Sequence, residues 1–487
     1  MSNQSVYHKR VKVGIVSFTD TREVAGIDVI NRRNLKYQSS LASYMRKGGF
    51  DVVEAVGRQN VNSKRLAAEA AHRLLAEEVD CVAIGCWKWT DPMLVVELVR
   101  RIGCPVMLVG VNDPDATALG CIAAVGAALW EIAPGDNALR HERCLTGFDR
   151  VSCWARGAGA LTRLRRSSIL LWGGSYCLKM PHLEDDNSYL KSFLIGDILN
   201  EDQYVLIRGA DELLKSNMNR ITKFINKCEG KGMMMAFDAR MFTPDALRRQ
   251  VALYLAAKDR LKELALDENI AGVSVKCQPE ISEVYGVTAC TIPAFVPYTE
   301  DAEGRKPLYA AVCEGDIKGL ITSVALQFMS GKPAGFGDIR TLKADGREHL
   351  VISNCGGASI YYSRLAGRFA EDAAGVDMSA QCQGASGGAV GYRSPGFGEV
   401  TVARLIRIAG EYRMQYAVGN AVETKQEWLN QLGWGSMWPI TVIDIGLDLE
   451  DFVSRVSSNH FSFIPGDFSG EIEFFCSAAG IEVERME

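Results

Sequence analysis

Histidine is scarce in this sequence, with six residues among 487, and the histidines lie far apart along the chain. Zinc sites built from several neighbouring histidines are therefore nearly excluded. The 14 cysteines form no C-x-x-C pair, and most lie within apolar runs, where a free thiol packs as a small hydrophobic side chain. This cysteine pattern predicts a reduced protein in the cytoplasm.

The sequence also lacks an apolar run long enough for a membrane span, which needs about 18 uninterrupted residues. Its first residues do not contain the apolar core of a secretory signal, so we expect none. Basic runs are short and the net charge is −5, which argues against a nucleic-acid surface. We therefore expect neither a membrane nor a nucleic acid as a partner.

Two nucleotide-binding motifs are missing. No G-x-G-x-x-G follows a predicted strand, and no G-x-x-x-x-G-K-[ST] occurs. A nicotinamide-dependent oxidoreductase and a P-loop enzyme therefore have little support.

What the sequence does contain is a regular alternation of apolar strand-like runs and helical patterns. The strands expected in the first region are 11–18, 52–55, 81–87 and 105–111. Those expected in the second region are 168–172, 204–207 and 271–278. The final region is richer in Gly and Ser, and its alternating stretches are 349–354, 399–408, 413–422 and 440–445. The pattern predicts two doubly wound, Rossmann-like α/β domains (1–165 and 166–345), followed by a β-rich, barrel-like C-terminal domain (346–487).

The strongest candidate site lies between residues 308 and 340. An apolar run stops at Glu314, a helical pattern follows, and a second run stops at Asp338. In a parallel strand–helix–strand unit the two strand ends would lie side by side, so both carboxylates would project into one crevice. Such a pair suits a divalent metal or acid–base catalysis. Capping of a helix and of a turn is the other common role for acids at these positions.

His460 is a third candidate, in SSNHFSFIPGD just before another apolar run. A lone histidine in such a place is often structural. Two acids and one histidine, completed by water or sugar oxygens, nevertheless suit a hard cation such as Mn2+ or Mg2+.

These motifs resemble the L-fucose isomerase family, within the wider L-fucose and L-arabinose isomerase group. Glu314 in CEGD, Asp338 in FGDIR and His460 in SSNH occur in the family's order and with similar spacing. The resemblance spans nearly the whole chain. It implies that these three residues bind Mn2+, or alternatively Mg2+ or Co2+. It also implies that Glu314 and Asp338 act as the catalytic acid–base pair.

Other segments agree with the resemblance and imply a substrate site. The residues implied to contact the sugar are Arg22 in FTDTRE, Trp87 in CWKW, Gln278 in KCQPE, Trp438 in MWPITVID, and Asn459. In the family, the residue at the position of Trp87 reaches the site of a neighbouring subunit. Three cationic residues are not required by a neutral deoxy-sugar but could bind an anionic one: Lys88, Lys179 and Arg393.

The resemblance implies an aldose–ketose isomerase, which moves a proton between C1 and C2 of a free monosaccharide through a cis-enediol. L-fucose or D-arabinose is the expected type of substrate, and an anionic sugar such as sulfoquinovose is the alternative. A non-catalytic sugar-binding protein is the alternative of another class, and it predicts binding without turnover or a metal requirement. The resemblance further implies a homo-oligomer, with a hexamer favoured.

Overall fold

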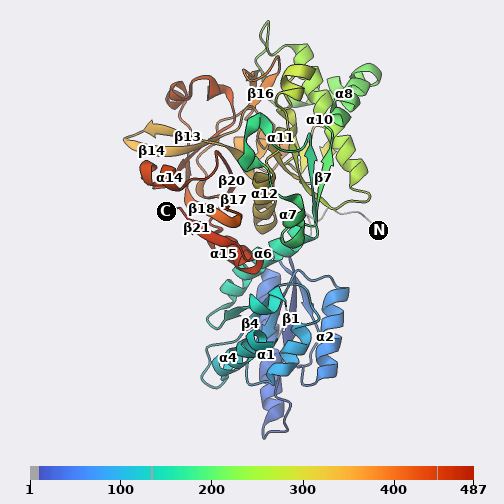
Figure 1. Cartoon of the computed structure of the whole chain (residues 1–487), viewed down its shortest axis with the longest axis vertical. Helices are drawn as coiled ribbons and strands as arrows, with labels where there is room; N and C mark the ends of the chain where they lie inside the picture. The colour runs from blue at the N-terminus through green and yellow to red at the C-terminus, as the bar shows by residue number, and fades with distance from the viewer. Residues whose placement is uncertain (1–9, 133–134, 447, 487) are drawn as a thin grey trace. The chain divides into compact units, whose positions relative to one another are not determined.

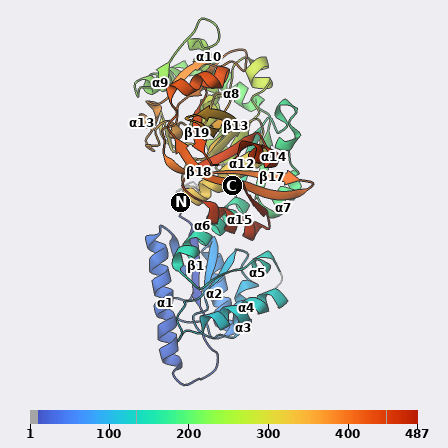
Figure 2. The same ribbon diagram turned by 90° about the vertical axis from the view of Figure 1, so that its left-hand side faces the viewer.

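The computed structural model describes residues 10–132, 135–446 and 448–486, which form two compact units (Figure 1, Figure 2). The larger unit consists mainly of Leu164–Ser469, and the smaller one combines residues 10–163 with Gly470–Ile481. The domain borders expected after residues 165 and 345 stay predictions. No helix in the described ranges combines the length and the apolar surface that a bilayer crossing requires.

A five-stranded parallel sheet, with strand order β2-β1-β3-β4-β5, forms the centre of the smaller unit. Its strands are β1 (Lys12–Ser17), β2 (Asp51–Glu54), β3 (Cys81–Gly85), β4 (Val106–Val109) and β5 (Glu142–Cys144). The helices of this region are α1 (Ile27–Lys47), α2 (Lys64–Ala76), α3 (Pro92–Val99), α4 (Ala118–Ile132), α5 (Asp136–Leu139), α6 (Phe148–Arg165) and α15 (Ser469–Ala479). Every residue of β3 is buried, as expected for an apolar strand covered on both faces of a parallel sheet. The predicted alternation of strands and helices is confirmed here.

The larger unit contains a second parallel sheet, with strand order β12-β9-β6-β7. Its strands are β6 (Ser168–Trp172), β7 (Asp197–Glu201), β9 (Ile270–Val275) and β12 (Ala310–Cys313). The longer helices beside it are α8 (Tyr204–Ser216), α9 (Met218–Glu229), α10 (Pro244–Leu264) and α12 (Ile317–Ser330). Thr243 begins α10 by accepting a hydrogen bond from the backbone N–H of Ala246, and Pro244 follows at the first helical position.

The strand predicted at 204–207 is wrong, because these residues form the first turn of α8. The run Tyr204-Val205-Leu206-Ile207 has the composition of a strand, but only Leu206 of the four is buried. The strand of this region is β7, which comes just before it and contains two charged residues. Tertiary packing therefore overrides local strand preference at this point.

A strand-rich sheet makes up much of the rest of the larger unit, with strand order β17-β20-β13-β14-β19-β18-β21. Its strands are β13 (Gly335–Ala344), β14 (Arg347–Ser353), β17 (Gly398–Ile408), β18 (Glu411–Val422), β19 (Ile440–Asp444), β20 (His460–Pro465) and β21 (Glu482–Arg485). The four strands predicted from alternating stretches of the final region are present as β14, β17, β18 and β19. Because β17 also pairs along its length with β18, six of these strands form a closed ring.

The parallel strand–helix–strand unit predicted around α12 is wrong. β12 lies in the parallel sheet, whereas β13 pairs antiparallel with β14 and β20 in the strand-rich sheet. β13 does not stop at Asp338 but continues to Ala344, where the turn at Asp345 and Gly346, both with positive φ, leads into β14. Asp338 is therefore a residue within a strand rather than one at a strand end.

Helix α12 joins these two sheets. All of its residues except Ser330 are buried, and it contacts β12 and β9 of the parallel sheet and β17 and β20 of the strand-rich sheet (Figure 1). A helix made mostly of apolar residues is stabilised by such burial. Its N-terminus, directly after Glu314, is thereby held against the strands that carry Asp338 and His460.

Candidate metal centre

Three side chains from separate elements of the larger unit meet at the N-terminus of α12. Glu314 follows β12, whereas Asp338 and His460 are cross-strand partners on β13 and β20. The Nε2 atom of His460 lies 3.5 Å from Glu314 Oε2 and 3.5 Å from Asp338 Oδ1. One ligand atom of each of the three residues lies within 4.8 Å of the other two. The structure thus brings together the three residues that the sequence predicted as metal ligands.

Burial differs sharply among the three side chains. The side chain of His460 is 1% exposed and that of Glu314 is 7% exposed, whereas that of Asp338 is 31% exposed. The cluster is therefore closed on the histidine side and open to solvent beside Asp338. A small ligand could approach the carboxylates from that direction.

The backbone of Glu314 has an unusual conformation. Its φ is 65° and that of Gly315 is 67°, so two successive residues are left-handed. For a residue other than glycine this costs about 1–2 kcal/mol. A side chain at Gly315 would not fit, because its Cβ would lie 2.5 Å from the carbonyl oxygen of Gly174. This turn directs the Glu314 carboxylate toward His460, and such strain is often found at functional sites.

Asp316 fixes the orientation of the His460 ring. Its Oδ2 atom lies 2.9 Å from His460 Nδ1 and accepts a hydrogen bond of 2.5 Å from Nη1 of Arg404 on β17. Its Oδ1 atom accepts a hydrogen bond from the backbone N–H of Gly319 and so caps α12. Because Nδ1 faces Asp316, Nε2 faces the two other carboxylates. A carboxylate that holds a histidine in this way is typical of metal sites.

The pKa values in the cluster are shifted by burial and by charge. Burial opposes a charge on His460, but hydrogen bonds to Asp316 and Glu314 and the nearby carboxylates hold its pKa well above 6.5. Burial raises the pKa of Asp338, and Glu314 adds to this, although the charge on His460 opposes it. For Asp316, burial is outweighed by Arg404 and His460, which lower its pKa. A proton on His460 Nε2 therefore occupies the place that a cation would take, so metal and proton would compete.

Asn459 and Gln278 lie next to this cluster. The side-chain amide of Asn459 donates a hydrogen bond of 2.8 Å to Asp338 Oδ1, and its oxygen lies 2.8 Å from Nε2 of His182. Gln278 lines a pocket together with Glu314 and donates a hydrogen bond of 2.9 Å to Gln383. The predicted contact of each residue with the sugar stays a prediction.

Lys179, Arg393 and Trp438 are also in the larger unit, but they are not members of the group formed by Glu314, Asp338 and His460. Lys179 is exposed, on the turn Cys177–Lys179. Arg393 donates hydrogen bonds to the carbonyl oxygens of Ser436 and Trp438 and lines a different cavity of about 430 Å³. Trp438 is 4% exposed. Their predicted roles in substrate binding stay predictions.

Arg22, Trp87 and Lys88 belong to the smaller unit. Arg22 forms an ion pair of 2.7 Å with Asp20, and Lys88 donates a hydrogen bond of 2.9 Å to the carbonyl oxygen of Asp115. The side chain of Trp87 is fully buried, and its indole N–H donates a hydrogen bond of 2.7 Å to Ser17. In this conformation the Trp87 ring packs in the hydrophobic core of the smaller unit. Its predicted contact with a neighbouring subunit stays a prediction.

Sequence reasoning missed several residues that shape the cluster, namely Asp316, Arg404, His182, Cys313 and Cys355. Asp316 had a detectable signal, since it stands in the same CEGD turn as Glu314 and precedes a helix. Arg404 had none, because its contact with Asp316 spans 88 residues and depends on how β17 pairs with β20.

Comparison with known proteins gives one further finding. No protein-family model matches the chain. The chain is 22% identical over 258 residues to a protein of Alkalicoccus urumqiensis named sulfoquinovose isomerase. The match covers 50% of each protein, so the chain spans about half the length of this curated relative. The similarity indicates a relationship to an isomerase, and the resemblance to the L-fucose isomerase family stays a prediction.

Proposed function

We propose that this protein is a metal-dependent aldose–ketose isomerase that acts on a free monosaccharide. The observation that carries the proposal is the convergence of Glu314, Asp338 and His460 from three separate elements, with the ring of His460 held by Asp316. A purely structural cluster would not need two carboxylates beside a partly open surface. The distant similarity to an isomerase supports the same conclusion.

The donor set fits a divalent cation. Two carboxylate oxygens and one imidazole nitrogen suit a hard or borderline ion such as Mn2+, with Mg2+ and Co2+ as alternatives. Such an ion, when bound, would hold two adjacent sugar oxygens and offset the negative charge that develops on them. The side of the cluster that is open to solvent lies beside Asp338.

Glu314 and Asp338 would move the proton between the two carbons. One carboxylate would take the proton from the C–H group, and a carboxylic acid would return a proton to the neighbouring carbon. Asn459 would hold Asp338 in place, because its amide donates to Oδ1 and leaves Oδ2 for the substrate.

The substrate class is part of the proposal. The name of the relative supports a sulfonated hexose, sulfoquinovose, as a substrate to be tested beside neutral L-fucose and D-arabinose. Of the cationic candidates, Lys179 lies three residues from His182, whose ring contacts Asn459. A Lys179 ammonium would provide a charge-assisted hydrogen bond to a sulfonate.

The experiment is to incubate metal-free protein with Mn2+ and a panel of neutral and acidic aldoses, and to detect the ketose by NMR. We expect ketose to form only when Mn2+ is present, and from at least one aldose of the panel. Binding of a sugar without ketose formation would instead support the non-catalytic sugar-binding protein. Ketose formation in metal-free protein would contradict the role of the metal.

A further inference from the structure

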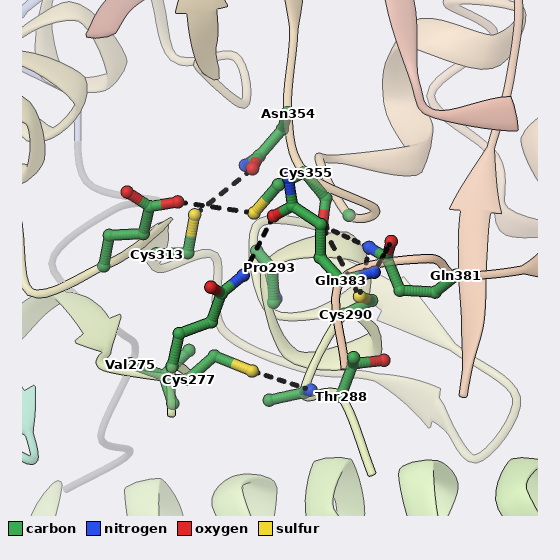
Figure 3. A pocket seen from close by; sticks show the side chains of 14 residues that line it. Val275, Cys277, Thr288, Cys290, Pro293, Cys313, Asn354, Cys355, Gln381 and Gln383 are labelled. Carbon is green, nitrogen blue, oxygen red and sulfur yellow. Dashed lines mark hydrogen bonds between the residues drawn. The ribbon is translucent and has the colours of Figure 1, made fainter. Parts of the chain in front are cut away.

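Four cysteines line a small pocket next to Glu314. They are Cys277, Cys290, Cys313 and Cys355, and Figure 3 shows their sulfur atoms around one space. The cavity has a volume of about 20 Å³, enough for one water molecule or one ion but not for a sugar. All four are free thiols. This pocket therefore differs in size and chemistry from a substrate site.

Two of these thiols lie close to the Glu314 carboxylate. Cys355 Sγ lies 3.4 Å from Glu314 Oε1, and Cys313 Sγ lies 3.2 Å from the side-chain oxygen of Asn354 (Figure 3). One ligand atom each of Cys313, Glu314 and Cys355 lies within 4.8 Å of the others. Two sulfurs and one carboxylate oxygen thus already surround a common point.

The two oxygens of Glu314 face different neighbours. Oε2 lies 3.5 Å from His460 Nε2, whereas Oε1 lies 3.4 Å from Cys355 Sγ. Glu314 can therefore serve the cluster with Asp338 and His460 through one oxygen and the thiols through the other. A carboxylate that bridges two cations uses its oxygens in this way.

Asn354 is a further polar residue of the pocket. Its side chain is 3% exposed and lines the pocket, yet its Nδ2 atom has no hydrogen-bond partner among the described residues. A buried polar atom without a partner costs about 1–3 kcal/mol and calls for an explanation. A water molecule in the pocket would accept from this N–H group, whereas a cation would not.

The distances fit a tetrahedral ion. Zinc binds cysteine sulfur at about 2.3 Å and carboxylate oxygen at about 2.1 Å, so adjacent sulfur and oxygen ligands lie roughly 3.5 Å apart. The observed sulfur–oxygen distances are 3.4 Å and 3.2 Å. Two thiolates favour a thiophilic ion over Mn2+.

We propose that Cys313, Cys355 and Glu314 bind one thiophilic divalent cation of the zinc and cadmium type, with the Asn354 oxygen as fourth donor. Binding replaces the two thiol protons, which pass to solvent, and no oxidation or reduction takes place. This second site goes beyond the proposed isomerase activity, because it does not require a sugar. Because Glu314 uses different oxygens for the two sites, both ions fit at once.

The test is a titration of Mn2+-loaded protein with Cd2+, followed by the ultraviolet absorbance of sulfur-to-cadmium charge transfer. All variants carry Cys382→Ser, because Cys382 is exposed and would add a background signal. We expect one further Cd2+ per chain. Cys355→Ser and Cys313→Ser should each weaken Cd2+ binding at least about tenfold, since each removes a direct ligand. Zn2+ should displace the bound Cd2+.

Two control variants separate the alternatives. Cys153 is a matched control, since it also lies beside a carboxylate, that of Glu471. It belongs to the smaller unit and not to the proposed site, so Cys153→Ser should leave the absorbance unchanged. Asp338→Asn should also retain the absorbance, since Asp338 belongs only to the cluster with Glu314 and His460. Failure of the isomerase proposal would therefore not affect the result for the cysteine site. If Cys313→Ser lowers the melting temperature, the test of the proposal rests on Cys355→Ser, because Cys355 is less buried. No charge-transfer band in the parent protein, or a band that persists when both cysteines are replaced, would overturn the proposal.

Discussion

Asp316 accepts hydrogen bonds from three groups at the base of the metal cluster, and each hydrogen bond has a different structural role. The ring of His460 is oriented, the charge of Arg404 is balanced, and the N-terminus of α12 is capped. The side chains of Asp316, Arg404 and His460 are at most 1% exposed, so none can find a substitute partner in water. The geometry of the cluster therefore depends on a residue that does not face the ligand.

We expect Asp316→Asn to weaken Mn2+ binding about 10–100-fold, as loss of the carboxylate behind a ligand histidine does. Asn caps helices about as well as Asp, so the helix should persist. The charge of Arg404 would lose its partner, at a cost of about 3 kcal/mol in the free energy of unfolding. Calorimetric titration with Mn2+ and chemical unfolding measure the two effects.

Asp448→Asn is the matched control for that variant. Asp448 caps α14 (Leu449–Arg455) by accepting from the backbone N–H of Asp451. Its replacement should leave Mn2+ affinity unchanged. Equal Mn2+ affinity of Asp316→Asn and the parent protein would show that Asp316 does not position His460 for a metal.

Glu314→Gln and Asp338→Asn test the proposed acid–base pair. Each should lower kcat about 10²–10⁴-fold, because an amide cannot exchange the proton. Both changes conserve shape, so circular dichroism spectra should match those of the parent protein. Steady-state kinetics on whichever aldose is converted gives the measurement, and unchanged kcat in either variant would remove that residue from the mechanism.

Local sequence was enough to select the three clustered residues, but not the residues that hold them. Glu314, Asp338 and His460 stand in short sequence motifs that can be recognised one at a time. Arg404 lies within an ordinary strand, and its role arises only when β17 and β20 pair. Contacts of that kind depend on register, which no short motif specifies.

At the scale of elements, the helical and parallel-sheet parts could be predicted better than the link between the two sheets. Apolar runs marked β1, β6 and β12 correctly, because these strands are buried on both faces. β13 was assigned to the wrong sheet, since Gly337-Asp338 looks like a strand end. Its hairpin with β14, closed at Asp345-Gly346, instead makes it antiparallel.

An ion-pair network connects three elements of the larger unit and gives a prediction on pH. Glu303, between β10 (Glu300–Asp301) and β11 (Gly304–Arg305), pairs with Arg220 of α9 at 2.6 Å and Lys258 of α10 at 2.9 Å. The hydrogen bond from Arg220, opposed by burial and aided by Lys258, lowers the pKa of Glu303 to about 2. A carboxyl group with a lowered pKa stabilises the fold above its ordinary pKa of about 4.5 and loses this effect as the pH falls toward 2.

Glu303→Gln should therefore lower the free energy of unfolding at pH 7 by about 1–2 kcal/mol, with solvent screening taken into account. The difference from the parent protein should shrink below pH 4.5 and be much smaller at pH 3. Urea unfolding at the two pH values measures it. Glu263→Gln, which removes a partner of Arg260 on an exposed surface, should have little effect at either pH. A difference that does not change with pH would show that the charge of Glu303 is not responsible.

At the scale of the whole molecule, the metal should contribute to stability. Removing it with a chelator should abolish turnover and lower the melting temperature, because the close carboxylates lose their counter-ion. Mn2+ at about 100 times its Kd should restore about 2.7 kcal/mol. Differential scanning calorimetry with and without Mn2+ measures this change. Asp338→Asn should not respond to Mn2+, and a parent protein that does not respond either would contradict the metal centre.

The resemblance to L-fucose isomerases also leads us to propose a homo-oligomer, with a hexamer favoured. Sedimentation equilibrium on the purified chain gives its mass directly. A multiple of the 53.3 kDa chain mass, sixfold in the favoured case, is expected. A monomer at all accessible concentrations would contradict it, and would also remove any contribution of Trp87 to a neighbouring site.

The ring of strands has a consequence for how the cluster can change. Arg404, His460 and Asp338 stand on the consecutive strands β17, β20 and β13, and the pairing of β17 with β18 closes the circle. In an open sheet an edge strand could slide by two places and keep its inward residues inward. A closed circle forbids that slide, since shifting one strand would break pairing with both neighbours at once. Evolution can therefore replace individual side chains around the cation, but it cannot change the distances between them by shifting the register of one strand.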